Sequence, residues 1–412
     1  MTKRTIWCIS KYASPPKYGV GARLYYVAQE FKKMNHDVLL ISSDANHLAT
    51  YPKTKERYNL DDIEGLKHLW IKTLKYERSA SIKRFLSWFA FEFHLRRLKR
   101  SSLPKPDVVI VSSLSLLSVF YGVYLTRKYR AKLIVEIRDI FPLTLTEEFR
   151  VPKWNPMVLF LGWTEKYAYK KADLIVGTMP NLIEHVKKII NKERPVIHSP
   201  IGIHQRWFSP LKKTDEVNQL FQNNEKFTIG YAGSMGQTNA LEPFIRVIES
   251  LKDNQDIQFV LVGAGDMKET YKERLHDQTN VVIGPRIDQS EIPYFLSLCD
   301  VLYLSTHDSA LWQYGQSLNK MVDYMMAGKP IIASYSGYQS MLNEAGSGVF
   351  IPTNDEAAIL GAIKTYQDMS EQQRREIGLA GQQWVKEHHD YQTIGRNYLN
   401  HIDKLFNENT NR

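Results

Sequence analysis

Lys320 and Asp323 stand three residues apart in the stretch YGQSLNKMVDYMMAGKPIIAS, which runs from Tyr314 to Ser334. The apolar residues of this stretch recur at helical spacing, with Ser317 as the expected N-cap and Gly328 as the expected stop. Lys320 then lies in the first turn, where the helix dipole disfavours a cation. An anionic ligand held by Lys320 and by free N–H groups near Ser317 would resolve this conflict. Asp323 could accept hydrogen bonds from hydroxyls, and phosphate beside a diol describes a sugar nucleotide.

The same residues allow two other interpretations. Lys320 and Asp323 could pair with each other across one turn, although their order does not complement the helix dipole. Ser317 and Lys320 also match the Ser-x-x-Lys motif of penicillin-binding enzymes. Those enzymes act outside the cytoplasm, whereas we find no Lys-Thr-Gly and expect no signal peptide from the short apolar run at the start. We therefore favour a ligand site.

Two loops of the first half follow expected strands and could contribute chemistry. Gly19 and Gly21 let backbone N–H groups approach a ligand, but Leu24 stands where the dinucleotide fingerprint needs its third glycine. A plain turn is the alternative. Arg138 and Asp139 end an apolar strand, where charges are costly unless paired. They either form an ion pair with each other or face a cleft and contact substrate.

Two loops of the second half suit phosphate. Gly233, Ser234, Met235 and Gly236 form a turn whose backbone N–H groups could cradle phosphate oxygens. This turn lacks the lysine of a P-loop, so we do not expect triphosphate hydrolysis. Arg286 follows another expected strand, and its guanidinium suits a phosphate. A solvated surface arginine is the alternative.

Alternating strands and helices must position these loops. In the first half we expect strands at 5–10, 37–43, 107–113, 132–139 and 173–178, with helices at 22–34, 165–172 and 179–190. After a proline-containing loop, the second half continues with strands at 227–233, 257–265, 280–284, 300–305 and 330–334, and with a helix near 241–251. Strands separated by helices imply parallel sheets covered on both faces. We predict an α/β chain with two doubly wound, Rossmann-like domains and a cleft between them.

The composition is that of a soluble globular protein of two or three domains, with 412 residues, 43% of them hydrophobic and 24% charged. Cys8 and Cys299 cannot form a disulfide framework, which fits a reducing cytoplasm, and we find no metal-ligand cluster. The uncharged run 108–126 is just long enough to span a bilayer. Its four serines and its strand-like start instead predict a strand, a loop and a buried helix.

Positive charge is concentrated in the first half. Residues 1–205 contain 35 Lys and Arg against 18 Asp and Glu, and the remainder contains 19 against 26. Within the basic half, the stretch 77–102 places aromatic residues between cationic ends, which as a helix is typical of an interfacial membrane helix. A core helix with a solvated tail and a single-stranded nucleic-acid site are the alternatives. We favour an anionic membrane surface and expect no nucleic acid.

The order of the motifs resembles the retaining glycosyltransferases of family 4, which have the GT-B fold, along nearly the whole chain. The resemblance lies in GVGARL, VEIRDIFPLTL and YAGSMG, and most specifically in GPRIDQSEIPYFLSLCDVLYLS and QSLNKMVDYMMAGKPIIAS. The subgroup it resembles transfers amino sugars in bacterial surface-polysaccharide assembly. The resemblance implies an acceptor domain at 1–205, a donor domain at 206–387, and a C-terminal helix at 388–412 that crosses back to the first. It also implies a UDP-linked sugar donor, a lipid-linked acceptor, no metal or other cofactor, and a cytoplasmic place on the inner face of the membrane.

The resemblance also assigns roles to residues. It places Lys320 and Arg286 near the donor diphosphate, Asp323 at the ribose, and Arg138 and Asp139 facing the acceptor or the transferred sugar. The donor-binding set is Gly19, Gly21, Gly233, Ser234, Met235, Gly236, Arg286, Gln316, Ser317, Lys320 and Asp323, and the catalytic set is Arg138, Asp139 and Lys320.

The sequence departs from this family at three places. Gly315 replaces a family glutamate, the turn at 233–236 lacks the usual Arg and Lys, and the hinge at 201–204 reads Ile-Gly-Ile-His. Phosphate neutralisation is thereby left to Lys320 and Arg286. A nucleotide-sugar epimerase of similar fold and a non-catalytic sugar-nucleotide-binding protein, the latter suggested by Gly315, are the rival functions.

Overall fold

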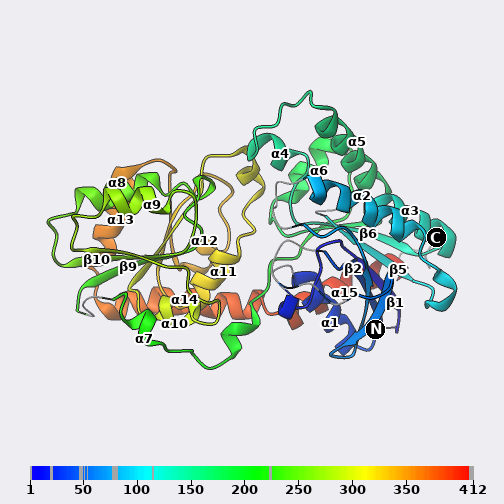
Figure 1. Cartoon of the computed structure of the whole chain (residues 1–412), viewed down its shortest axis with the longest axis horizontal. Coiled ribbons are helices and arrows are strands. Elements are labelled where there is room, and N and C mark those ends of the chain that lie inside the picture. Colours follow the sequence, from blue (N-terminus) through cyan, green and yellow to red (C-terminus); the bar gives the residue numbers. More distant parts are fainter. Residues whose placement is uncertain are drawn as a thin grey trace. The chain divides into compact units, whose positions relative to one another are not determined.

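The chain forms two compact units, shown in the computed structural model of Figure 1. The first comprises Met1–Pro200 and Tyr391–Arg412, and the second Ile201–Asp390, a few residues from the boundaries expected from the sequence. The structure describes residues 2–18, 22–45, 50, 52, 54–76, 82–113, 116–221 and 225–407. Gly19 and Gly21 therefore lie outside the described residues.

The first unit is built on an eight-stranded sheet in the order β3-β4-β2-β1-β5-β6-β7-β8. The strands are β1 (Thr5–Ile9), β2 (Asp37–Ser43), β3 (Tyr58–Ile63), β4 (Leu66–Ile71), β5 (Val108–Ser112), β6 (Lys132–Ile137), β7 (Leu174–Gly177) and β8 (Val196–His198). All neighbours are parallel except β3 and β4, a hairpin that the sequence analysis missed. Its turn uses positive φ at Glu64 and Gly65, and β3 is mostly exposed, so neither the usual turn residues nor an apolar run marked it.

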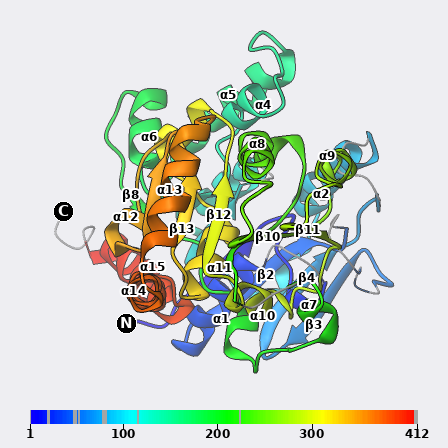
Figure 2. The ribbon, with the colours of Figure 1, turned by 90° about the vertical axis from the view of Figure 1, so that its left-hand side faces the viewer.

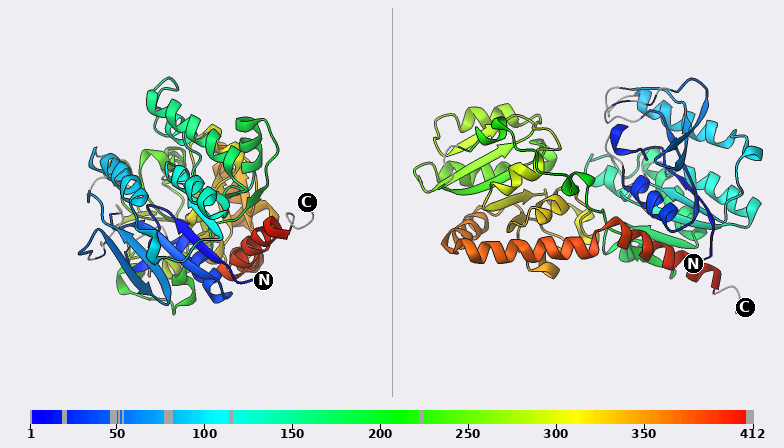
Figure 3. Two further views of the ribbon diagram at one scale, coloured as in Figure 1. Left: turned by 90° about the vertical axis from the view of Figure 1, so that its right-hand side faces the viewer. Right: turned by 90° about the horizontal axis from the view of Figure 1, so that it is seen from below.

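Helices cover both faces of this sheet (Figures 1 and 3). They are α1 (Arg23–Lys33), α2 (Ile82–Arg96), α3 (Ser118–Tyr129), α4 (Leu143–Glu147), α5 (Pro156–Lys171), α6 (Leu182–Ile190) and α15 (Tyr391–Asn407). α2, α3 and α5 lie on one face and α1 and α15 on the other. The uncharged run 108–126 forms β5 and most of α3, as predicted. No helix in the described part of the chain has the length and apolarity needed to cross a bilayer.

The second unit has a six-stranded, fully parallel sheet in the order β11-β10-β9-β12-β13-β14 (Figure 2). The strands are β9 (Phe227–Ala232), β10 (Ile257–Val262), β11 (Val281–Gly284), β12 (Val301–Ser305), β13 (Ile331–Ser334) and β14 (Gly348–Ile351). Along β10, Val260 and Val262 belong to one apolar core and Phe259 and Leu261 to another, so the sheet is buried on both faces. The strand order reverses between β9 and β12, which is where ligands of such sheets bind.

The helices of the second unit include those that the sequence indicated near 241–251 and within 314–334, and others that it did not. They are α7 (Asp215–Asn218), α8 (Glu242–Ser250), α9 (Lys268–Arg274), α10 (Ile292–Ser297), α11 (Asn319–Met326), α12 (Leu342–Ala345), α13 (Glu356–Asp368) and α14 (Glu371–His388). Gly328, with φ of 67°, follows the end of α11 as predicted. Ser317 is not its N-cap: that position is Leu318, whose side chain cannot accept a hydrogen bond. The C-terminal helix expected at 388–412 corresponds to α15, which packs on α1, where Tyr398 contacts Phe31.

Candidate functional site

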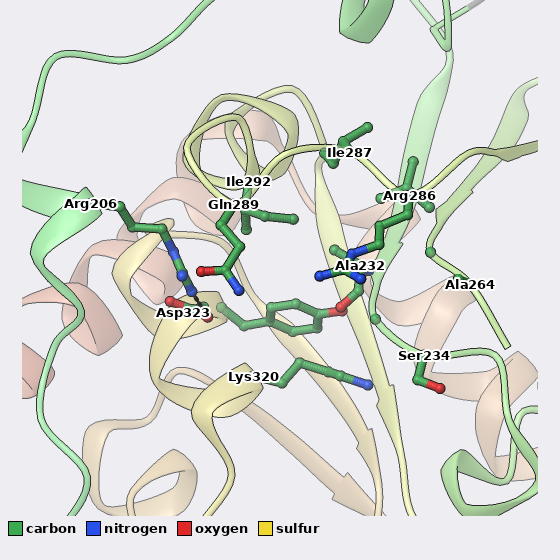
Figure 4. A pocket seen from close by; sticks show the side chains of 14 residues that line it. Arg206, Ala232, Ser234, Ala264, Arg286, Ile287, Gln289, Ile292, Lys320 and Asp323 are labelled. Carbon is green, nitrogen blue, oxygen red and sulfur yellow. Dashed lines mark hydrogen bonds and ion pairs between the residues drawn. The ribbon is translucent and has the colours of Figure 1, made fainter. Parts of the chain in front are cut away.

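A pocket of about 440 Å³ lies at the carboxyl ends of β9, β10 and β11 in the second unit (Figure 4). Its polar walls come from the turn after β9, the loop after β11, the start of α11 and the 3₁₀ turn Gln205–Phe208. Of the predicted donor-binding residues, those that line it are Gly233, Ser234, Arg286, Lys320 and Asp323. Residues that are far apart in the sequence are thus brought together at the sheet edge where a ligand is expected.

Lys320 is held in place by two side chains that flank the turn at 233–236. Its Nζ donates hydrogen bonds to the hydroxyl of Tyr231 at 2.9 Å and to Oδ1 of Asn239 at 3.2 Å. Tyr231 in turn donates to the carbonyl of Ser234 at 2.6 Å. A Cβ at Gly233 would lie 2.5 Å from Nζ, so a larger residue at this position would push the ammonium group of Lys320 out of its present place. The two contacts leave one of the three N–H donors of Lys320 for a ligand.

Burial lowers the pKa of Lys320 to about 8. No carboxylate pairs with its ammonium group among the ion pairs of the described residues, so the charge is desolvated without a counter-ion. The predicted alternative, a pair between Lys320 and Asp323, is therefore wrong. A cation kept partly buried beside open space is what an anion-binding site requires.

Asp323 is paired with residues that the sequence analysis did not single out. Its carboxylate accepts a hydrogen bond from Nη2 of Arg206 and another from Nε1 of Trp207 at 2.7 Å. Burial raises the pKa of Asp323, while the charge of Arg206 and the hydrogen bond from Trp207 oppose this shift. Figure 4 shows Arg206 pointing toward Asp323 at the pocket wall. A ribose hydroxyl would have to use the lone pairs that these two donors leave.

The turn at 233–236 offers fewer backbone donors than predicted. The N–H of Gly233 donates to the carbonyl of Val262 at 3.0 Å, and that of Met235 donates to Ala264 at 2.8 Å. These bonds fasten the turn to the end of β10, and they correct the prediction that this whole stretch of backbone faces phosphate. The side chain of Met235 packs in the core. Ser234 is exposed at the pocket.

The remaining predicted donor residues, Arg286, Gln316 and Ser317, differ in their relation to the pocket. Arg286 is exposed and lines the pocket from the loop after β11. Gln316 and Ser317 precede α11 but are not among the residues that line the pocket. The amide of Gln316 is buried, and neither its nitrogen nor its oxygen has a hydrogen-bond partner in the described part of the chain. What these residues do toward a ligand stays a prediction.

Arg138 and Asp139 belong to the first unit, in the loop after β6. The backbone N–H of Arg138 donates to the hydroxyl of Ser113 at 2.9 Å, which holds this loop against the end of β5. The described ion pairs include none between Arg138 and Asp139, so that alternative is wrong. Burial raises the pKa of Asp139, and the nearby charge of Arg138 opposes the shift.

The charge at Glu136 has a structural partner instead. Its carboxylate accepts from Nη1 of Arg23 at 2.5 Å and from the hydroxyl of Ser112 at 2.9 Å. Arg23 also donates to the carbonyls of Ser199 and Pro200 at 2.7 and 3.1 Å. Both charged side chains are at most 2% exposed. Arg23 thus connects α1 to β6 and to the segment that ends at Pro200. Glu136 lies two residues before Arg138.

No group of His, Cys, Asp and Glu residues in the described ranges could hold a metal ion. Cys8 and Cys299 are free thiols, and burial raises the pKa of both. That catalysis needs no metal stays a prediction.

Two family matches cover most of the chain in succession. Residues 18–204 match the family described as Glycosyltransferase Family 4, and residues 226–368 match the one described as Glycosyl transferases group 1. No curated protein matches the chain by sequence.

Solved structures share the architecture at low identity. Sucrose-phosphate synthase from Thermosynechococcus elongatus is 16% identical over 98% of this chain and 100% of that one, with a TM-score of 0.73. The catalytic domain of starch synthase IV from Arabidopsis thaliana, bound to ADP and acarbose, is 13% identical over 100% of both chains, with a TM-score of 0.67. HepE from Anabaena with UDP-glucose is 12% identical over 97% of this chain and 100% of that one, with a TM-score of 0.61. With a glycosyltransferase domain in each half and this shared fold, the chain is a glycosyltransferase of the GT-B type.

Proposed function

We propose that the enzyme transfers an N-acetylated amino sugar, with retention, from a UDP-linked donor to a lipid-linked saccharide. The product would enter the assembly of capsule, O-antigen or exopolysaccharide. The observation that carries the proposal is the pocket of the second unit, where Lys320 and Arg286 face one open space beside Ser234. Two cations beside a small-residue turn suit a diphosphate. Neighbours of the same fold support a nucleotide-sugar donor, since their structures contain UDP-glucose and UDP-2-fluoro glucose.

The chemical step breaks the bond between the sugar and the diphosphate oxygen, which takes the electron pair. Lys320 and Arg286 would stabilise the charge that develops on this oxygen, since cations already held in place need not reorganise when the leaving group becomes charged. The acceptor hydroxyl passes its proton to the departing diphosphate as its oxygen bonds to the sugar. Arg138 and Asp139, at the carboxyl end of β6, are our candidates for contacts with the acceptor or the transferred sugar.

The lipid-linked acceptor and the place at the inner membrane face find support in α2. Residues 77–81 lie outside the described part, and the helix begins at Ile82. One side of it exposes Lys83, Leu86, Phe89, Phe93, Arg96 and Arg97. An apolar middle between cationic ends suits an anionic bilayer surface. The other side packs in the core through Phe91 and Leu95. The helix is therefore anchored to the unit while its exposed side can contact a membrane.

Incubation with UDP-N-acetylglucosamine, UDP-N-acetylgalactosamine or UDP-glucose, with and without a lipid-linked saccharide, tests the proposal. We expect labelled sugar to move to the lipid acceptor from an N-acetylated donor. Isomerised donor without transfer would favour an epimerase, and donor binding without turnover would favour a binding protein. Either result would refute the proposal.

Donor binding should weaken as the pH rises through about 8. An anionic diphosphate binds the protonated form of Lys320, and burial lowers the pKa of this lysine to about 8. The site is therefore mostly charged at neutral pH and mostly uncharged one pH unit above its pKa, so Kd should rise roughly tenfold between pH 7 and pH 9. Calorimetric titration with UDP-N-acetylglucosamine measures this.

The matched variant for the pH series is Lys320→Arg. A guanidinium stays protonated throughout this range, so the variant should give a flat profile even if its affinity is lower. A wild-type Kd that does not change with pH, or an equal slope in the variant, would show that another group causes the dependence.

A further inference from the structure

A second exposed apolar surface lies in the first unit, on α5 and the loop before it. Its large side chains are Phe149, Trp154, Leu159, Phe160 and Trp163, which we call the α5 surface. Trp154 is 77% exposed and Leu159 61%. Soluble surfaces rarely gather so many large apolar groups on one segment without a partner. We propose that the α5 surface inserts into an anionic bilayer, which deepens the proposed function by naming a contact with the membrane outside 77–102.

The exposed side of α5 changes along its length from apolar to cationic. Leu159, Phe160 and Trp163 occupy its first half, and Lys166 and Lys170 continue the same side at helical spacing. The segment 149–171 contains five Lys and Arg but one acidic residue. The apolar first half of α5 would thus suit the acyl chains of a bilayer, and its cationic second half would suit the phosphate headgroups.

The one acidic residue of this segment does not weaken the positive surface. Glu165 is buried, and its carboxylate is bonded to His185 at 2.7 Å and to the hydroxyl of Tyr169 at 3.0 Å. Its charge therefore faces the interior, and the cations of α5 face solvent. This charge distribution favours an anionic partner surface.

The apolar end is rigid and has few unsatisfied backbone donors. Asn155 caps the helix by accepting from the N–H of Met157 at 2.9 Å, and Pro156 has no N–H to leave unpaired. The ring of Trp163 packs against Phe120 of α3 and against Tyr167, with centroids 5.8 Å away in both cases, and these two rings also contact each other at 5.4 Å. A supported ring and a capped helix start can enter the headgroup layer at little cost in order or in lost hydrogen bonds.

The α5 surface shares its face of the unit with the exposed side of α2. α3 contacts α2 and, through Phe120, Trp163 of α5. Figure 3 shows these helices on the same face of the sheet. One flat membrane could therefore meet both exposed sides, which supports a bilayer as the occupant.

Sedimentation of the full chain with vesicles tests the proposal. Wild type should bind vesicles containing phosphatidylglycerol and bind pure phosphatidylcholine poorly. Trp154→Gln with Leu159→Gln should lower the partition coefficient at least about tenfold. Lys166→Gln with Lys170→Gln should lower it by about fivefold per lysine on anionic vesicles only. The control, Leu360→Gln with Leu379→Gln, removes two exposed leucines from the second unit and should bind like wild type.

Three results would overturn the inference: no binding of wild type to anionic vesicles, undiminished binding of the Trp154/Leu159 variant, or a wild-type dimer that this variant dissociates without losing vesicle binding. The third would assign the surface to a second copy of the chain. Transfer to a short, water-soluble acceptor should stay unchanged in every variant of the α5 surface. Absence of transfer in wild type would refute the proposed function and leave the vesicle result standing.

Discussion

Replacing Lys320 with methionine should lower kcat by about 100- to 1000-fold. This is the usual effect of removing one preorganised group that stabilises the negative charge of a leaving group. The described pocket contains Arg286 as its other unpaired cation, because Arg206 is bound to Asp323. The diphosphate would thus lose one of two charges. Steady-state rates with the accepted donor, together with Kd for UDP, separate the loss in kcat from the loss in binding.

The same variant should fold at least as well as wild type. Burial lowers the pKa of Lys320, so its charged form is less favourable in the folded chain than in the unfolded one, and its removal relieves this cost at neutral pH. The matched control is Lys329→Met, which removes a lysine beyond the other end of α11. Full activity in Lys320→Met, or an equal loss in the control, would contradict the role of Lys320.

Replacing Arg23 with methionine should lower the free energy of unfolding of the first unit by about 3–5 kcal/mol, because the carboxylate of Glu136 would stay buried without its partner. The two side chains are 2% and 0% exposed, and Arg23 also holds the carbonyls of Ser199 and Pro200. Urea denaturation followed by tryptophan fluorescence measures the loss.

Two variants make this result specific. Arg23→Met with Glu136→Leu should recover much of the loss, since an apolar pair of similar volume can replace a buried ion pair. Lys187→Met breaks a pair with Glu184 in which both side chains are about half exposed, and it should cost about 0–1 kcal/mol. An effect of Arg23→Met as small as that of Lys187→Met would mean that the buried pair does not stabilise the unit.

Local patterns predicted much of the fold because the residues that determine a strand or a helix lie within a few positions of one another. Most of the parallel strands are short apolar runs that end in polar loops, and the structure has these where they were expected. The short edge strands β8 and β14 were not predicted, because each has only three or four residues and is largely half-buried. The β3–β4 hairpin escaped because its outer strand is exposed and its turn is Glu64-Gly65. α5 begins nine residues before the expected helix, since its exposed aromatic residues blur the alternation of apolar and polar positions that marks a helix in water.

By itself the sequence determined that Lys320 stands in the first turn of a helix after a strand, and that the turn at 233–236 follows another strand, because both features depend on residues a few positions apart. The tertiary structure alone decided which charges are paired. Arg206 meets Asp323 across 117 residues, and Arg23 meets Glu136 across 113. Contacts between residues so far apart in the sequence produce no periodic pattern of residue types. They form only after each sheet has folded and brought its loops to one edge.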